Sequence, residues 1–366
     1  MGRVCDPCPG DARRHGFPSM ARFKTAADIK VGVIGYGGAF NMGKHHLNEM
    51  KLAGMTPTAV CELDPKRLEV ATTDFPGIET YSTVKDLLKK SSVDLLAIIT
   101  PHNTHAPLTI QCLKAGKGVV SEKPFAISTA ECDAMIAAAK KYKAFLSTYH
   151  NRHWDGCILD ALKVVQSGKI GDIIRIECRM GSHGQPKDWW RTSKSISGGG
   201  LLDWGVHLLE YSLQLLGNAK ISEVTGFVSS GYWADKTAWK KDTIEDEGNV
   251  VVRMSTGQLL TLRISSIDSR PYDYHVLVTG TKGSLAFNAG SSTYELLVPG
   301  KNGVMNVERG KVQPSQSAQL YQNVANHLTK GEKLVITPEW ARRPIHIIDL
   351  AYQSAKKGQA LKAKYA

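Results

Sequence analysis

The sequence predicts an α/β protein that begins with a parallel, doubly wound sheet and continues into a second α/β domain with a large, mostly antiparallel sheet. Three observations carry this prediction. Short apolar strands alternate with helical patterns over residues 30–150. After about residue 150 the pattern changes to strands of alternating polarity and to hairpins. The length of 366 residues is more than one hydrophobic core usually serves, which favours two domains.

The first domain is expected to repeat a strand–helix unit. The run 94–100 is almost continuously apolar, which is typical of a strand covered on both faces. Asp64 and Pro65 suit the N-cap and first position of a helix, and Ser128 with Glu131 has capping-box spacing. The predicted strands are 30–35, 58–61, 94–100 and 118–121, with a last parallel strand before His150, and the predicted helices are 43–53, one opening at Pro65, 104–115 and 128–142.

The second domain is expected to cover one face of its sheet with helices. Ile174, Ile176, Cys178 and Met180 alternate with charged residues, which predicts a strand with one packed face and one solvated face. The other predicted elements are a helix over 153–167 and two hairpins, with strands 249–254 and 259–265 and strands 275–279 and 284–287.

The chain start reads differently from the rest. Residues 1–29 contain several prolines and arginines and show no apolar periodicity, so we expect a disordered N-terminal extension. The predicted domains are therefore 30–150, which binds a nucleotide, and 151–366, which binds substrate and forms oligomers.

Composition limits the partners and the compartment. Lys and Arg number 46 and Asp and Glu number 34, which gives a formal charge of +12. The basic residues are scattered, so we expect no nucleic-acid partner. No apolar run reaches the roughly 18 to 20 residues of a membrane helix, so no membrane partner is expected. Seven dispersed cysteines predict no disulfide framework, and the absence of an export signal favours a cytoplasmic protein.

A glycine-rich turn after the first strand is the first candidate site. Gly35 permits a tight turn, Gly37 lets the backbone approach a pyrophosphate, and the following helix start offers free N–H groups. Gly38, Ala39 and Phe40 complete the loop, and Phe40 stands where the dinucleotide-binding fingerprint has its third glycine. The pattern favours a bound dinucleotide, and a tight turn without a ligand is the alternative.

Glu62 bears on the identity of that dinucleotide. It ends the second strand, 27 residues after Gly35. A carboxylate at this point accepts hydrogen bonds from the adenosine ribose and repels a 2′-phosphate, which favours NAD over NADP. Lys66 and Arg67 lie close in sequence and oppose that preference, and a solvated strand end is the alternative for Glu62 alone.

Two further motifs carry groups suited to proton transfer. Glu122-Lys123-Pro124 ends a parallel strand, at the edge where open α/β sheets bind ligands, and a lysine there can polarise a substrate oxygen. Asp203 and His207 follow three glycines and are four residues apart, so on a helix they would share one face. A histidine can take a hydroxyl proton near neutral pH, and a carboxylate can orient it. Each motif alone also fits a structural role.

The order and spacing of these motifs resemble the Gfo/Idh/MocA oxidoreductases, the relatives of glucose–fructose oxidoreductase and inositol dehydrogenase, over roughly residues 30 to 360. The resemblance implies a Rossmann domain followed by an α/β domain whose open sheet supports a homodimer or homotetramer. It implies that Lys123, Asp203 and His207 are catalytic. The residues that it places beside the cofactor are Thr100, Pro101, Asn103, His105, Glu122 and Lys123.

Several residues are candidates for the substrate wall. Trp190 and Arg191 precede the glycine run, and aromatic rings stack on sugar faces while arginine binds oxygens in a fork. His150 and Arg152 follow the last parallel strand, on the side that faces a substrate. The remaining candidates for substrate binding are Lys123, Asp203 and His207.

No metal is expected. His102 with His105, and His150 with His153, have a spacing that a metal could use, but no acidic or cysteine ligand completes either pair.

The predicted activity is NAD-dependent hydride transfer at a secondary hydroxyl of a sugar, glycoside or polyol. His207 would take the proton, Lys123 would stabilise the developing oxyanion, and Asp203 would fix His207 or bind substrate. One alternative is an NAD-dependent glycoside hydrolase or glycoside 3-oxidase that recycles the cofactor in the same site. A second alternative is a regulator that binds the dinucleotide without catalysis.

Overall fold

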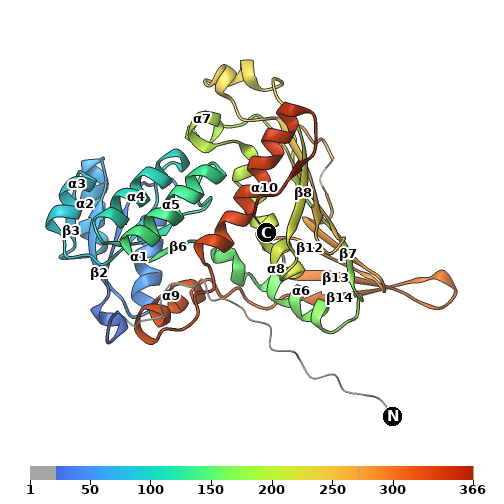
Figure 1. Ribbon diagram of the computed structural model, residues 1–366, viewed down its shortest axis with the longest axis horizontal. Coiled ribbons are helices and arrows are strands. Elements are labelled where there is room, and N and C mark those ends of the chain that lie inside the picture. The colour runs from blue at the N-terminus through green and yellow to red at the C-terminus, as the bar shows by residue number, and fades with distance from the viewer. Residues whose placement is uncertain (1–21, 271, 366) are drawn as a thin grey trace, which may run out of the picture.

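Two sheets organise the chain, which a computed structural model describes at residues 22–270 and 272–365 (Figure 1). The first sheet contains six parallel strands in the order β3-β2-β1-β4-β5-β6. The order reverses between β1 and β4, and such a switch point opens a crevice at the carboxyl ends of the strands. The strands are β1 (Lys30–Ile34), β2 (Thr56–Cys61), β3 (Glu79–Tyr81), β4 (Leu95–Ile98), β5 (Gly118–Ser121) and β6 (Leu146–Thr148).

Helices cover both faces of this sheet. In β4, Leu96 and Ile98 join one buried apolar cluster, while Leu95 and Ala97 join another on the opposite face. This arrangement confirms the predicted strand that is buried on both sides. The helices of this domain are α1 (Met42–Leu52), α2 (Pro65–Asp74), α3 (Val84–Lys90), α4 (His105–Lys114) and α5 (Thr129–Tyr142), with the short 3₁₀ segments η1 (Ala26–Asp28) and η2 (His102–Thr104).

Two helix starts follow from local sequence, as predicted. The Asp64 side chain accepts a hydrogen bond from the backbone N–H of Lys66 at 3.0 Å, and Pro65 is the first residue of α2. The Ser128 hydroxyl accepts one from the N–H of Glu131 at 3.2 Å at the start of α5. Each cap satisfies an N–H group that the helix itself leaves free.

The second sheet has nine strands in the order β14-β13-β12-β11-β7-β10-β9-β8-β15. All neighbours pair antiparallel except β7 and β10, which are parallel, and both predicted hairpins are present. The strands are β7 (Ile173–Gly181), β8 (Ile221–Ser229), β9 (Glu247–Met254), β10 (Leu259–Ser265), β11 (Val276–Gly280), β12 (Ser284–Phe287), β13 (Thr293–Pro299), β14 (Met305–Lys311) and β15 (Leu361–Lys362).

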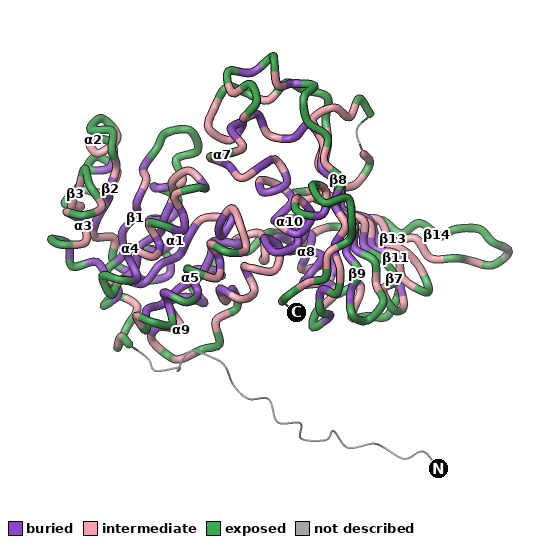
Figure 2. Tube along the Cα trace, turned by 45° about the horizontal axis from the view of Figure 1, so that its top comes forward, coloured by how far each residue is buried: buried purple, intermediate pink, exposed green. Residues whose placement is uncertain are grey.

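Helices line one side of this second sheet, and the hairpin of β13 and β14 extends beyond them. Figure 2 shows the buried residues gathered where α8 and α10 approach the strands, whereas the tip of the hairpin is exposed. The remaining elements are α6 (Gly156–Gln166), α7 (Lys194–Ser197), α8 (Gly205–Leu216), α9 (Gln319–Lys330), α10 (Pro338–Lys357), and the 3₁₀ segments η3 (Asn151–Trp154), η4 (Trp190–Thr192), η5 (Gly200–Leu202), η6 (Ala234–Lys236), η7 (Lys240–Asp242) and η8 (Lys301–Gly303).

Helix α9 departs from the predicted division at residue 150. It belongs to the second half of the chain, but Tyr321, Val324 and Leu328 are buried in the cluster that contains Val31 and Leu47 of the first domain. A division drawn from sequence order could not anticipate this, because α9 returns to the first sheet after the second sheet is complete. The chain therefore passes from the first domain to the second after β6, returns to the first domain for α9, and passes back to the second domain for α10.

Two smaller expectations also differ from the structure. Ile174 is 49% exposed, because the pairing of β7 with β11 skips this residue and so interrupts the alternation. Residues 22–29, counted within the predicted extension, contain η1 and end in Ile29, which is completely buried. The rest of the predicted extension, residues 1–21, lies outside the described residues.

No helix within residues 22–270 and 272–365 combines the length and the apolar character that a membrane crossing requires.

Candidate active site

The glycine-rich loop joins β1 to α1 at the switch point. Gly35 has φ +102°, and a Cβ there would lie 2.2 Å from the backbone oxygen of Ile99, so only glycine fits. A Cβ on Gly37 would meet no atom within 4 Å, which leaves open space above the loop for a ligand. Phe40 is 58% exposed in the same loop. An open loop before a helix start fits the phosphates of a dinucleotide.

Glu62 lies directly beside this loop, at the end of β2. Its Oε2 accepts a hydrogen bond from Tyr36 N at 2.6 Å, and its Oε1 accepts one from Leu63 N at 2.7 Å. Arg67 donates from Nε to Tyr36 O at 2.9 Å and lies next to Gly38. A carboxylate and a guanidinium therefore stand together where the adenosine ribose of a dinucleotide would lie.

The loops after β4 and β5 are joined through His105. This residue is completely buried, and its ring nitrogens lie 2.8 Å from Pro124 O and 2.9 Å from Thr100 O. Asn103 is exposed and Pro101 half-buried on the first of these loops. The structure thus gives His105 a supporting position between two loops at the edge of the crevice.

Glu122 is held by a residue that sequence reasoning missed. Its Oε1 lies 3.0 Å from Nε2 of the fully buried His46, and its Oε2 accepts a hydrogen bond from Lys123 N at 2.8 Å. Burial raises the pKa of Glu122, but the bond from His46 and the charge of Lys123 bring it below its ordinary value. Nδ1 of His46 bonds to the hydroxyl of Tyr321 on α9. No sequence signal joins these residues, because they come from three distant segments.

Lys123 and Asp203 meet across the two domains. Nζ of Lys123 lies 2.8 Å from Oδ1 of Asp203 and 3.2 Å from its backbone oxygen, and the lysine side chain is 16% exposed. Nε of Arg191 lies 3.8 Å from the same Oδ1. Burial raises the pKa of Asp203, and the charges of Lys123 and Arg191 outweigh this and lower it, so the carboxyl is ionised.

His207 lies in α8 and is almost fully buried, with its ring 5.5 Å from that of Trp204. Burial, followed by the charges of Lys123 and Arg152, lowers its pKa well below the ordinary value, so the imidazole is neutral at pH 7. The expected bond from Asp203 to His207 is not among the hydrogen bonds of the described residues. Helix α8 begins only at Gly205, so the side chains of Asp203 and His207 do not share a helix face. The carboxylate of Asp203 pairs with Lys123 instead.

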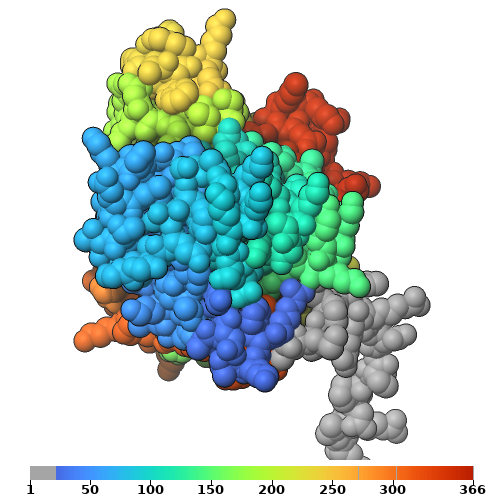
Figure 3. Space-filling view, turned by 90° about the vertical axis from the view of Figure 1, so that its left-hand side faces the viewer, coloured from blue at the N-terminus to red at the C-terminus, as the bar shows by residue number. Residues whose placement is uncertain are grey.

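The predicted wall residues surround this group. The guanidinium of Arg191 lies 4.4 Å from the ring centre of Trp190 and 5.2 Å from that of Phe40, so it reaches across from η4 to the glycine-rich loop. Arg152 lies 4.7 Å from the ring centre of Trp204. Figure 3 shows the segment that carries η6 and η7 (yellow) above the first domain (blue to green).

Three imidazoles in this region share an unusual property: a buried ring nitrogen with no hydrogen-bond partner in the described part of the chain. Buried polar atoms in proteins nearly always have a partner, so such nitrogens indicate a place for a ligand group or an ordered water. His150 lacks partners on both nitrogens, and burial lowers its pKa to about 4. The atoms concerned are His102 Nε2, His150 Nδ1, His150 Nε2 and His207 Nδ1.

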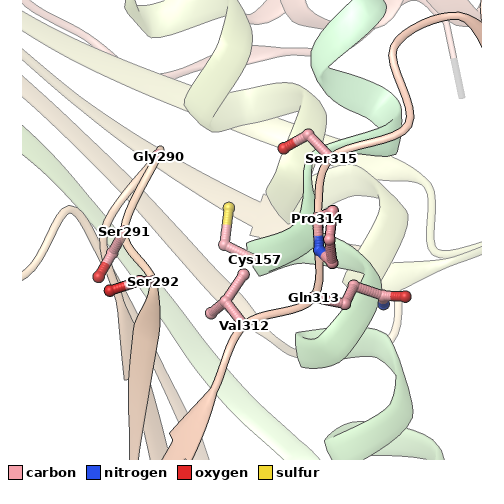
Figure 4. A pocket seen from close by; sticks show the side chains of 8 residues that line it. All are labelled: Cys157, Gly290, Ser291, Ser292, Val312, Gln313, Pro314 and Ser315. Atoms are coloured by element: carbon pink, nitrogen blue, oxygen red, sulfur yellow. The ribbon is translucent and has the colours of Figure 1, made fainter.

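A separate cavity of about 260 Å³ lies beside the start of α6 (Figure 4). Its lining offers three serine hydroxyls and the Cys157 thiol, whose pKa burial raises, and so lacks a group suited to proton transfer near pH 7. No cluster of three or more metal-binding side chains occurs in the described ranges. The lining residues are Cys157, Gly290, Ser291, Ser292, Val312, Gln313, Pro314 and Ser315.

Comparison with known protein families shows which family has this sequence pattern. Residues 29–150 match the oxidoreductase family with an NAD-binding Rossmann fold, and residues 158–286 match the GFO/IDH/MocA C-terminal domain. The chain belongs to the Gfo/Idh/MocA family of oxidoreductases. The predicted family and fold class are thereby confirmed, and this Gfo/Idh/MocA protein is an NAD-binding oxidoreductase.

Individual relatives share most of the chain. It is similar to scyllo-inositol 2-dehydrogenase (NADP(+)) IolW of Bacillus subtilis, with 24% identity over 347 residues that cover 91% of this chain and 95% of the relative. Myo-inositol 2-dehydrogenase of Thermotoga maritima is 28% identical over 260 residues, 70% of this chain and 74% of the relative. A solved levoglucosan dehydrogenase, in complex with NADH and levoglucosan, shares the fold with a TM-score of 0.78 at 20% identity, over 92% of this chain and 99% of that one.

Proposed function

We propose that this Gfo/Idh/MocA protein oxidises a secondary hydroxyl of a sugar, glycoside or polyol, or catalyses the reverse reduction, with NAD as the preferred cofactor. The observation that carries the proposal is the 2.8 Å contact between Lys123 Nζ and Asp203 Oδ1, next to the neutral His207, at the carboxyl edge of the parallel sheet. An amine, a carboxylate and an imidazole from distant segments meet where ligands of open α/β sheets bind.

Each of the three groups has a distinct part. His207 is neutral at pH 7 and takes the proton of the substrate hydroxyl. The ammonium of Lys123 stabilises the negative charge that develops on that oxygen. Asp203 holds Lys123 in place and, with Arg191, borders the substrate.

The first domain holds and orients the cofactor. Gly35, Gly37 and the start of α1 would hold the pyrophosphate, and Glu62 would accept hydrogen bonds from the adenosine ribose. Glu122 and the loop of Thr100 and Pro101 would lie beside the nicotinamide half. When bound, the nicotinamide supplies the acceptor for the hydride that leaves the substrate carbon.

The direct test is an assay of the purified full chain with NAD or NADP and a panel of scyllo-inositol, myo-inositol, levoglucosan and D-glucose, read as NADH or NADPH absorbance. Lys123→Met should lower kcat at least about 100-fold, because the ammonium acts on the reacting oxygen. Lys114→Met, an exposed lysine at the end of α4, is the matched control and should keep full activity.

Three outcomes would reject the assignment. Full activity in both Lys123→Met and His207→Gln would remove these groups from the mechanism. Cleavage of a chromogenic glycoside without net NADH would favour the redox-neutral hydrolase instead, and NADH binding with no turnover of any compound would favour a regulator.

We further propose a homodimer or homotetramer in the cytoplasm. Apolar side chains exposed on the second sheet support self-association, among them Phe227 at 61% and Ile174 at 49% exposure. The five cysteines within the described ranges are all buried free thiols, which agrees with a reducing compartment. Light scattering on protein eluted from a size-exclusion column measures the mass of the oligomer. A monomer at all concentrations would contradict the proposed homodimer or homotetramer.

A further inference from the structure

His102 is a buried imidazole for which the proposed mechanism has no use. It opens η2 on the loop after β4, and only 2% of it is exposed. Its Nδ1 lies 2.8 Å from the backbone oxygen of Ser197, which belongs to α7 of the second domain. Its Nε2 is buried and has no hydrogen-bond partner in the described residues. A polar atom left in this state destabilises the protein unless a ligand or an ordered water satisfies it.

The bond to Ser197 decides what Nε2 can offer. A carbonyl oxygen only accepts hydrogen bonds, so Nδ1 carries a proton and donates it. Burial, followed by the charges of His105 and Lys123, lowers the pKa of His102 well below its ordinary value, so the ring carries a single proton near pH 7. Nε2 is therefore an acceptor, and its missing partner is a hydrogen-bond donor.

The neighbours of His102 belong to the substrate side of the site. Its ring meets that of Trp190 edge to face, with the centroids 4.7 Å apart. The positive charges of Lys123 and Arg191 both act on it, and its own charge would act on Asp203. These are the groups that border the reacting hydroxyl in the proposed function.

We propose that Nε2 of His102 accepts a hydrogen bond from a second hydroxyl of the substrate, which makes His102 a specificity-determining residue of the site. This inference rests on the proposed function, which already names the substrate class, and adds a specificity-determining residue to it. A ring polyol or sugar can present one hydroxyl to Lys123 and His207 and another to His102. A simple alcohol would leave the buried acceptor unpartnered, and a site that leaves a buried polar group unpaired discriminates against that ligand.

The test compares His102→Phe with the unchanged chain on paired substrates. The pairs are the panel compound that is oxidised fastest and its monodeoxy analogues. The unchanged chain should lose about 3- to 10-fold in kcat/KM on the analogue that lacks the contacted hydroxyl. His102→Phe should lose the same factor on the parent compound and nothing further on that analogue. His183→Phe, an exposed histidine, is the matched control and should discriminate like the unchanged chain.

The paired design separates binding from structure. A merely structural role of His102 would lower activity on parent and analogue by the same factor and leave the discrimination intact, which would overturn the proposal. If none of the panel compounds is oxidised, the proposed function fails by itself, and the next measurement still tests His102.

Nitrogen-15 NMR of histidine-labelled protein gives that second measurement, and it does not require the variant to fold. The NADH complex should show His102 with Nδ1 protonated and Nε2 bare, and the Nε2 resonance should move toward the hydrogen-bonded range when a panel polyol is added. A shift on adding NADH alone would assign the donor to the nicotinamide carboxamide instead. No shift with either ligand would leave Nε2 without a ligand, and both of these results overturn the proposal.

Discussion

At the scale of single residues, Asp203 accounts for much of the electrostatics of the site. Its carboxylate lies between the amine of Lys123 and the guanidinium of Arg191 and stays ionised because these charges outweigh its burial. Without it, two cations would face each other beside a buried imidazole. Burial, followed by the charges of Lys123 and Arg152, lowers the pKa of His207, so in the proposed function the lysine that stabilises the oxyanion also keeps the base neutral.

The pH dependence of the reaction should reflect the lowered pKa of His207. Burial and the charges of Lys123 and Arg152 lower the pKa of His207, so the neutral form persists as the pH falls through 6.5. We expect kcat/KM to remain level through that value and to decline only at lower pH. Arg152→Met removes one cation, which raises the pKa of His207 and moves the decline to higher pH. A decline centred above pH 6.5 in the unchanged chain would contradict this assignment.

Cofactor choice is a second property of individual residues. Glu62→Ser removes the carboxylate that favours a free 2′-hydroxyl, while Arg67 stays beside the loop. The KM for NAD should rise about 10-fold, because hydrogen bonds to a charged acceptor are lost, and the KM for NADP should fall. Steady-state kinetics with both cofactors measure this. Glu69→Ser, an exposed glutamate on α2, is the control, and an unchanged NAD preference in Glu62→Ser would remove Glu62 from the ribose site.

At the scale of elements, two glycines of the glycine-rich loop have different roles: one is required for folding, and the other leaves room for a ligand. Gly35 is required by its own backbone angle and by Ile99, whereas Gly37 faces open space. Gly37→Ala should therefore leave the unfolding temperature unchanged but weaken NADH binding at least about 10-fold, because the added methyl group occupies the space of the phosphates.

Gly35→Ala is the contrasting variant and should destabilise the fold itself, since its Cβ would lie 2.2 Å from a backbone oxygen. Thermal unfolding and NADH fluorescence titration distinguish the two effects. Equal NADH affinity in Gly37→Ala and the unchanged chain would show that the ligand does not approach this loop.

The elements also show how far sequence reasoning reaches. The caps at Asp64 and Ser128, the buried strand β4 and both hairpins follow from local patterns and could be predicted. Strands such as β3, with three residues, carry too little pattern to identify. In the site, linear motifs predicted Lys123 and Asp203, but their contact could not be placed, since it depends on how two domains pack. His46 carried no signal, because its role exists only through Glu122 and Tyr321.

At the scale of the whole molecule, buried neutral histidines make stability depend on pH. The pKa of His150 is about 4 in the folded chain against 6.5 in the unfolded chain. Between these values the unfolded chain binds a proton that the folded chain does not, so the free energy of unfolding falls as the pH falls. His102 and His207 act in the same direction.

His150→Phe should remove one such contribution. Between pH 7 and pH 5.5 the unchanged chain should lose about 1 kcal/mol more of its unfolding free energy than this variant. Urea unfolding at the two pH values measures the difference, with His183→Phe as the control. Identical pH dependence in the unchanged chain and His150→Phe would mean that His150 is already protonated or exposed in the folded state.

The position of α9 has a consequence for how the protein is made. Tyr321, Val324 and Leu328 complete the apolar cluster around β1, although they are synthesised long after that strand. During synthesis, part of the apolar interior of the nucleotide-binding domain therefore stays exposed until α9 has been made and packs against it. Premature termination before α9 should therefore yield a product that neither retains NAD nor escapes proteolysis, and cofactor retention would show that synthesis has passed this helix.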